Sequence, residues 1–374
     1  MRIAVVGAGC AGSVAAWRLA EAGLAPVLLE RDAAPGDSAA CGGVMLHALA
    51  GRLQLPAELL FEDVHRVTLL NGRRRRELVM PRPAFVNFDR RRLDRFLAER
   101  AERSGAELRC GCHVTGWDPG SGRLSWAEAG RTAEAPFDVV VFADGPRSVA
   151  RRHGLGPPPD APAGVAFYRE LEGSLGDEAT CEFHLGLPAD QVGYLWVFPK
   201  GGAVQVGVGR LQERGDPPLR DLVDRFVAAD PRLAGRPVTC SRGGIVPLAT
   251  GRRLSCPGAL AVGDAAGLVN PVTGGGLVYA VASGEIAARS IVRCVRGGLD
   301  RVAIARDAER RWALSIHAGW LRLFGVLLAV CRRRPGLYPP LLRVYLEVLP
   351  VLAPLAGVLA RRQQADGRQH SRLS

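Results

Sequence analysis

Hydrophobic and polar positions follow the periods of a βαβ unit at the start of the chain. Apolar runs at Ile3–Val6 and Val27–Leu29 flank an alanine-rich stretch, residues 13–22, which predicts a strand, a helix and a second strand. From 91 to 104, apolar side chains recur at helical spacing opposite arginines and glutamates, and Gly105 follows as a stop signal. This stretch predicts a surface helix packed on a sheet.

Later apolar runs extend that sheet and introduce a second one. Residues 139–142 and 259–262 each lead into a turn with aspartate and glycine, and predict two further buried parallel strands. Between them, 194–198 and 204–208 alternate as strands do, and Lys200, Gly201 and Gly202 join them as a hairpin. We therefore expect a first lobe from 1–156 and 246–299, an inserted antiparallel sheet over 157–245 as the substrate domain, and a helical lobe over 300–374.

Two apolar segments of the last lobe bear on membrane contact. Residues 321–331 are too short to cross roughly 30 Å of hydrocarbon. Residues 341–360 are long enough, but Arg343, Glu347, Pro350 and Pro354 interrupt them, which disfavours a transmembrane helix. A packed helical lobe and an interfacial, membrane-leaning surface both remain open.

The formal charge of +12 comes almost entirely from arginine, with Lys200 as the only lysine. Such a skew more often reflects a GC-rich genome than a chosen chemistry, although clusters at 73–76 and 332–334 would suit phospholipid head groups. No aromatic interleaving or DNA-binding motif accompanies these clusters, so we expect no nucleic-acid partner.

Nine cysteines and the first residues of the chain indicate its compartment. The number is odd and no Cys-x-x-Cys pair occurs, so we expect neither a disulfide framework nor a zinc or iron–sulfur site. A strand that starts at Ile3 leaves no room for a signal peptide, and we expect a cytoplasmic protein.

The glycine pattern between the first strand and the first helix predicts a dinucleotide site. Gly7, Gly9 and Gly12 let the backbone approach a pyrophosphate at the N-terminus of the helix. Glu30 ends the second strand, where a carboxylate can accept hydrogen bonds from ribose hydroxyls. Far downstream, Gly263 and Asp264 end another strand and favour FAD over NAD, because a carboxylate there can hold the ribityl chain of a flavin nucleotide.

Residues 263–288, reading GDAAGLVNPVTGGGLVYAVASGEIAA, resemble the flavin-binding stretch of the geranylgeranyl reductase family. Segments 41–43 (Cys-Gly-Gly), 89–90 (Asp-Arg) and 194–199 (Tyr-Leu-Trp-Val-Phe-Pro) agree with it, so the resemblance covers residues 1 to about 290. It implies an α/β, Rossmann-like FAD-binding fold of the para-hydroxybenzoate-hydroxylase type. Cys10 stands where this family usually has proline.

The resemblance also implies site residues. The residues expected to line FAD are Ala11, Glu30, Cys41, Gly42, Arg90, Val114, Asp264, Gly276 and Leu277. It further suggests that Asp144 and Gly145 lie near the flavin diphosphate. A strand that simply ends in a tight turn would have the same Asp-Gly sequence.

The Tyr194, Trp196 and Phe198 side chains share one face of a strand and could form a broad apolar wall for a long hydrophobic substrate. Such a stripe more often belongs to an ordinary hydrophobic core. The geranylgeranyl reductase family lines an isoprenoid cavity with this motif, so the resemblance favours the wall. Cys41 could be a small buried hydrophobe. The resemblance instead places it beside the flavin and the substrate double bond as a catalytic residue.

These features favour an FAD-dependent reductase that saturates double bonds in a polyprenyl lipid or quinone side chain, with NAD(P)H or a reduced protein carrier as electron donor. An FAD-dependent hydroxylase uses the same fold and motifs, and a prenyl-binding escort protein is a non-enzymatic alternative. A halogenase is disfavoured, because it needs a lysine near its flavin and Lys200 follows the aromatic strand.

Overall fold

The computed structural model describes residues 1–176, 179–186, 192–211, 217–251 and 253–348. One sheet forms the base of the molecule, with strand order β18-β19-β12-β1-β2-β8. Its strands are β18 (Ser255–Cys256), β19 (Ala259–Ala261), β12 (Val139–Phe142), β1 (Ile3–Val6), β2 (Val27–Leu29) and β8 (Glu107–Arg109). All neighbours are parallel except the antiparallel pair β18–β19. The predicted parallel strands thus belong to one sheet.

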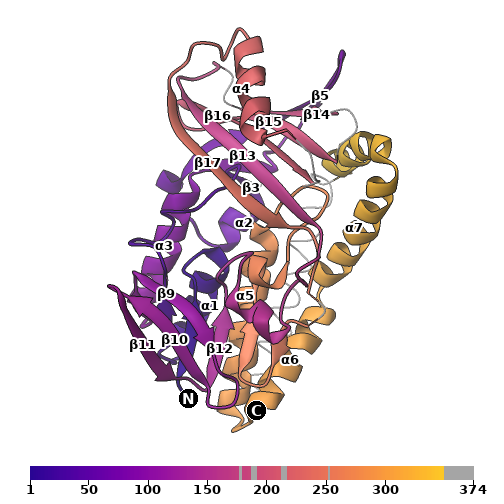
Figure 1. The fold of residues 1–374 in the computed structure, drawn as a ribbon. Coiled ribbons are helices and arrows are strands. Elements are labelled where there is room, and N and C mark those ends of the chain that lie inside the picture. The colour runs from indigo at the N-terminus through magenta and orange to yellow at the C-terminus, as the bar shows by residue number, and fades with distance from the viewer. Residues whose placement is uncertain (177–178, 187–191, 212–216, 252, 349–374) are drawn as a thin grey trace.

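Different layers cover the two faces of this sheet. Helices α1 (Cys10–Glu21), α3 (Arg90–Arg103) and α5 (Leu277–Arg296) share a core with its Ile3 and Val5 side chains. The alternate residues Ala4 and Val6 face a core with Trp117 and Trp126. These two tryptophans come from a small sheet of β9 (Cys112–Trp117), β10 (Arg123–Glu128) and β11 (Arg131–Pro136), which is labelled in Figure 1.

A second large sheet lies at the other end of the molecule (Figure 1), in the order β17-β13-β16-β15-β14-β5-β6. Its strands are β17 (Val238–Pro247), β13 (Ala163–Glu172), β16 (Ala203–Leu211), β15 (Gly193–Pro199), β14 (Thr180–Leu185), β5 (Arg66–Asn71) and β6 (Arg74–Val79). Helix α4 (Leu219–Ala229) covers the face that carries Leu195 and Val197.

Two features of this sheet differ from the expectation of an antiparallel sheet built from 157–245. Strands β5 and β6 come from the first part of the chain, and β5 runs parallel to β14. Because β5 pairs Val67 and Leu69 against Cys181 and Phe183, its apolar side chains complete the core of the sheet. Local periodicity gave no sign of this long-range pairing.

Smaller elements connect the two sheets. Strands β3 (Val44–Leu46), β7 (Phe85–Phe88) and β4 (Leu60–Val64) form a three-stranded sheet beside helix α2 (His47–Arg52) and the 3₁₀ turn η1 (Ala57–Leu59). Two further 3₁₀ turns, η2 (Val149–His153) and η3 (Gly263–Ala266), follow strands of the base sheet.

The chain then runs through α6 (Arg301–Ala313), α7 (Ile316–Arg333) and the 3₁₀ turn η4 (Pro335–Leu337), and residues 338–348 are helical. Within the described part of the chain, each helix taken singly is too short or too polar to span a bilayer, while α6 and α7, bent by 63°, pass together by length and composition. Of the apolar segment 341–360, residues 349–360 lie outside the described residues.

Candidate functional site

The loop from β1 into α1 has the close backbone approach that its glycines predict. A Cβ atom on Gly12 would lie 1.9 Å from the Gly7 carbonyl oxygen, and Gly7 itself has a φ of 93°. Only glycine fits either position. Gly9 caps α1 without a side-chain hydrogen bond to the helix, so amides of the first turn, including that of Ala11, stay available to an anion.

Glu30 ties this loop to the end of β2. Its two carboxylate oxygens accept the backbone N–H groups of Ala8 at 2.6 Å and Asp32 at 2.9 Å. Burial raises the pKa of Glu30, although both of these hydrogen bonds oppose that shift. Each oxygen retains a second lone pair, so the carboxylate can still accept from hydroxyl groups of a ribose.

A buried charge cluster lies next to the glycine loop. Arg90, the first residue of α3, donates to Asp94 at 2.8 Å, and its guanidinium would lie 3.6 Å from a Cβ atom placed on Gly9. Burial raises the pKa of Asp264, and Arg90 partly offsets this. Among the described residues, no group donates a hydrogen bond to the Asp264 carboxylate. This half-buried acceptor can therefore take a hydroxyl donor from a ligand.

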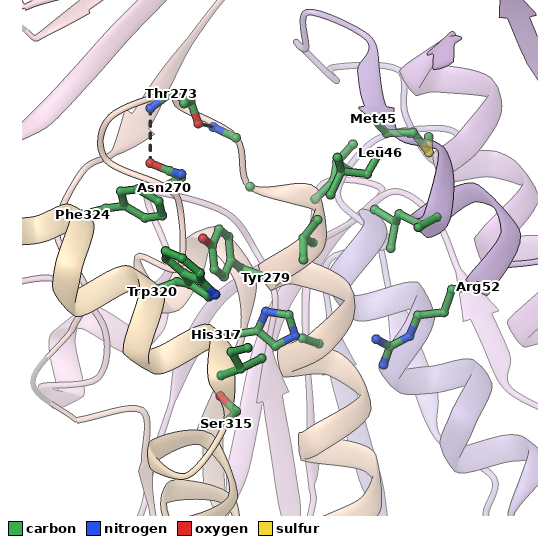
Figure 2. Close-up of a pocket in the computed structure, with 18 of the residues that line it drawn as sticks. Met45, Leu46, Arg52, Asn270, Thr273, Tyr279, Ser315, His317, Trp320 and Phe324 are labelled. Atoms are coloured by element: carbon green, nitrogen blue, oxygen red, sulfur yellow. Dashed lines mark hydrogen bonds between the residues drawn. The ribbon is translucent and has the colours of Figure 1, made fainter. Parts of the chain in front are cut away.

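The N-terminus of α5 faces the same region. Gly276 caps this helix without a side-chain hydrogen bond, and Leu277 is its first residue. The preceding loop is held by Asn270, whose side-chain oxygen accepts the amide of Val272 at 2.9 Å. The same oxygen accepts the amide of Thr273 at 3.3 Å (Figure 2). The free amides and the positive end of the helix dipole suit an electron-rich edge of a flavin ring.

Asp144 lies beside the glycine loop, since a Cβ atom on Gly7 would lie 3.0 Å from the Asp144 Cα atom. Val114 lies on the face of the base sheet away from α1. Val114 is buried on β9, in the core below β2. Asp144 follows β12 and accepts the Val149 amide at 2.8 Å through one oxygen, while its other oxygen is buried without a partner among the described groups. Gly145 has a φ of 79°, as a tight turn requires.

Cys41, Gly42 and Gly43 line a large groove on one side and contact the second sheet on the other. The Cys41 sulfur accepts the Gly43 amide at 3.4 Å. A Cβ atom on Gly43 would lie 1.6 Å from the Lys200 ammonium nitrogen, which donates to the Phe88 carbonyl at 2.7 Å. Lys200 is thus a buried support under the loop. Burial lowers its pKa.

The aromatic side chains of strand β15 lie at two depths. Tyr194 and Phe198 line the groove, and the Tyr194 hydroxyl donates to the Thr273 carbonyl at 2.8 Å. Trp196 points to the same face but lies behind them, where its indole N–H donates to Gln205 at 2.9 Å. Gln205 in turn donates to the Cys41 carbonyl at 3.1 Å. Sequence periodicity predicted the shared face, but it cannot distinguish a lining side chain from one that supports it.

The groove has a volume of about 3070 Å³ and runs along α5, between α1 and α2 on one side and α7 on the other. Tyr279, His317, Trp320 and Phe324 gather over α5, and Arg52 extends toward them from α2 (Figure 2). This space exceeds the roughly 300–1,000 Å³ of an ordinary small-molecule pocket. It can accommodate a flavin ring together with a long apolar molecule.

The residues present fit FAD. The glycine cradle, the open N-termini of α1 and α5, and the unpaired Asp264 acceptor face one continuous region at the carboxyl ends of β1 and β19. The sequence did not predict Asp94, Gln205 and His317 as residues of the site. It placed Lys200 only in the hairpin between two strands. Their roles depend on contacts between segments far apart in the chain. The lone lysine was visible in the sequence, but its burial was not.

Comparisons with known proteins agree with this geometry. A family model described as FAD dependent oxidoreductase matches residues 2–79, and one described as geranylgeranyl reductase catalytic domain matches residues 165–245. Digeranylgeranylglycerophospholipid reductase 2 of Methanopyrus kandleri is 31% identical over 83% of this chain and 81% of its own. The chloroplastic geranylgeranyl diphosphate reductase of Arabidopsis thaliana is 31% identical over 80% of this chain and 67% of its own.

Among solved structures, a geranylgeranyl bacteriochlorophyll reductase-like protein of Thermoplasma acidophilum superposes with a TM-score of 0.73. It covers 89% of this chain and 96% of its own, at 23% identity. At that identity the similarity supports the fold: an FAD-binding sheet, a second large sheet and C-terminal helices.

Proposed function

Because this chain belongs to the geranylgeranyl reductase family of FAD-dependent oxidoreductases, we propose that it saturates isolated carbon–carbon double bonds in a polyprenyl chain. The observation that carries the proposal is the groove itself. It begins at Cys41, Gly276 and Leu277, and its first part along α5 is apolar, lined by Val278 and Ala282. A long hydrocarbon chain can therefore lie along the groove, and its double bonds can reach the flavin end one at a time.

FAD supplies the reducing chemistry when bound, as the hydride source for one alkene carbon. The chain's own residues hold and orient the reactants. Glu30, Arg90 and Asp264 would bind the polar parts of FAD, and the α5 N-terminus would contact its ring. We propose NAD(P)H or a reduced protein carrier as the electron donor, and anaerobic mixing with each separately distinguishes them.

Tyr194 and Phe198 form the wall against which the alkene packs, since both line the groove near the loop that precedes α5. The hydrogen bond from Tyr194 to Thr273 fixes this wall to that loop and helps to exclude water. Cys41 lines the same groove as Tyr194 and Phe198, and we propose that its Sγ–H delivers or positions the proton for the second alkene carbon. A Cys41→Ala variant should retain FAD yet lose most of the reductase rate, and Cys41→Ser should lose less.

The direct test is product mass. Enzyme with reduced flavin is incubated anaerobically with a geranylgeranyl lipid, and with menaquinone in parallel. We expect a gain of two hydrogens for each double bond saturated. An unchanged mass for every polyprenyl compound, with an enzyme shown to hold FAD, would contradict the proposal.

We further propose peripheral contact with an anionic membrane surface on the cytoplasmic side. Leu323 and Val326 are exposed on α7 and do not line the groove, and the arginines at 332–334 follow them in the chain. A Val326→Glu variant should sediment less with phosphatidylglycerol vesicles than the parent, while Arg123→Gln, in the distant small sheet, should sediment as the parent does. Equal sedimentation of all three proteins would refute membrane contact through α7.

A further inference from the structure

The polarity of the side chains that line the groove changes along α5. At its flavin end, α5 presents Val278 and Ala282, and α7 adds Trp320 and Phe324. Further along, the groove is lined by charged residues from α1, α2, α5 and α6: Arg18, Arg52, Glu285, Arg289, Arg293 and Arg311. One end of the groove is therefore apolar and the other is rich in arginine.

Three of these arginines converge on one carboxylate. Glu285 is 2% exposed and pairs with Arg18 at 3.3 Å, with Arg289 at 3.1 Å, and with Arg52. Arg18 also pairs with Glu21, whereas Arg52 and Arg289 have Glu285 as their only ion-pair partner among the described residues. A single carboxylate cannot saturate two guanidinium groups, each of which carries five N–H donors.

In the described part of the chain, Arg52 has an unused hydrogen-bond donor, and Arg289 lies among other positive charges. The Arg52 Nε atom is buried and has no partner among the described groups. Burial lowers the pKa of Arg289, and the repulsion of Arg52, Arg18 and Arg311 lowers it further, despite the attraction of Glu285. The site thus carries excess positive charge at a partly buried position, which an anion would relieve.

Spacing connects this cluster to the flavin end. Leu277 and Arg289 are twelve residues apart on one helix, which corresponds to about 18 Å along its axis. Between them α5 lines the groove with Val278, Ala282 and Ile286. Burial, and then repulsion by Arg52, lowers the pKa of the neighbouring His317 to about 4, so that its ring is neutral at pH 7. A geranylgeranyl chain has a comparable extended length.

We infer that Arg52 and Arg289, with Arg18 and Glu285, form a phosphate or diphosphate site that binds the anionic head of the substrate while its polyprenyl chain extends along α5 to Cys41. This inference rests on the proposed function and specifies its substrate class. It favours polyprenyl phosphates and phospholipids over quinones, whose uncharged heads cannot use the excess charge. The planar guanidinium groups match two phosphate oxygens at once.

The test compares a charged and an uncharged substrate with the same chain, on FAD-loaded enzyme. Arg52→Gln and Arg289→Gln should each raise KM for geranylgeranyl diphosphate by about 10- to 100-fold with little change in kcat. KM for geranylgeraniol should not change. The control Arg123→Gln removes a surface arginine paired with Glu134 and should behave as the parent with both substrates. Equal losses with both substrates, or no loss with the diphosphate, would overturn the inference.

Calorimetry separates this inference from the reductase proposal, because it needs no turnover. Geranylgeranyl diphosphate should bind the parent enzyme and bind both variants more weakly, even if no double bond is reduced. Inorganic diphosphate alone should bind much more weakly than the prenylated form. Inorganic diphosphate that binds as tightly as geranylgeranyl diphosphate would mark a free-anion site and contradict the headgroup assignment.

Discussion

Helices α1 and α5 cross closely at Gly284, and replacement by alanine should separate them. A Cβ atom on Gly284 would lie 2.5 Å from the carbonyl oxygen of Ala11 and 3.4 Å from the amide nitrogen of Ala15. Both atoms are backbone, so no side-chain rotation can relieve the first contact. Overpacking of this kind costs about 1–3 kcal/mol, and we expect the upper end. The gain of helix propensity from Gly to Ala offsets about 1 kcal/mol.

A net loss of about 2 kcal/mol in the free energy of unfolding should therefore follow for Gly284→Ala, measured by urea unfolding of the FAD-free protein. Because Ala11 belongs to the dinucleotide loop, FAD affinity should fall as well. Gly319→Ala is the matched control: Gly319 lies inside α7, its added Cβ would contact nothing within 4 Å, and alanine should be neutral or stabilising. A Gly284→Ala variant as stable as Gly319→Ala would refute the close crossing of α1 and α5.

Three further substitutions test other contacts. Burial tends to raise the pKa of Glu182, but hydrogen bonds from Arg232 and His184 outweigh it and bring the pKa to about 2. This carboxylate should stabilise the fold by about 3 kcal/mol above pH 4.5, and the gain should be lost as pH falls toward 2; acid titration of unfolding should show a flatter profile for Glu182→Gln. Both oxygens of Glu30 accept backbone amides, so Glu30→Gln must turn an amide NH₂ toward one of them and weaken FAD binding by about 1–3 kcal/mol in a fluorescence titration. Trp196→Phe removes the N–H that Gln205 accepts and should lower the melting temperature without raising KM for a polyprenyl substrate, whereas a raised KM at unchanged stability would place Trp196 on the groove wall.

Much of the base sheet could be predicted because its signals are local. The apolar runs at Ile3–Val6, Val27–Leu29 and Val139–Phe142 form strands with these bounds, and the glycine loop lies between the first strand and its helix. These elements are encoded within a few residues of each other. The hairpin at 200–202 is equally local, and it joins β15 to β16 as predicted.

The second sheet and the groove depend on contacts that short-range patterns do not encode. Strand β5 pairs with β14 across more than a hundred residues, and the groove combines side chains from α1, α2, α5, α6 and α7. The arginines that share Glu285 looked in the sequence like ordinary members of a basic composition. Only their convergence on one buried carboxylate marks them as a site.

The central claim is that a flavin held by this fold reduces a polyprenyl double bond, and single-turnover oxidation of the flavin tests it most directly. The enzyme is loaded with FAD, reduced with dithionite, freed of excess reductant and mixed anaerobically with geranylgeranyl diphosphate. The absorbance of oxidised flavin should return at the rate at which the product gains two hydrogens, with one flavin oxidised per double bond. Flavin that stays reduced until oxygen is admitted, and then yields a hydroxylated product, would contradict the account.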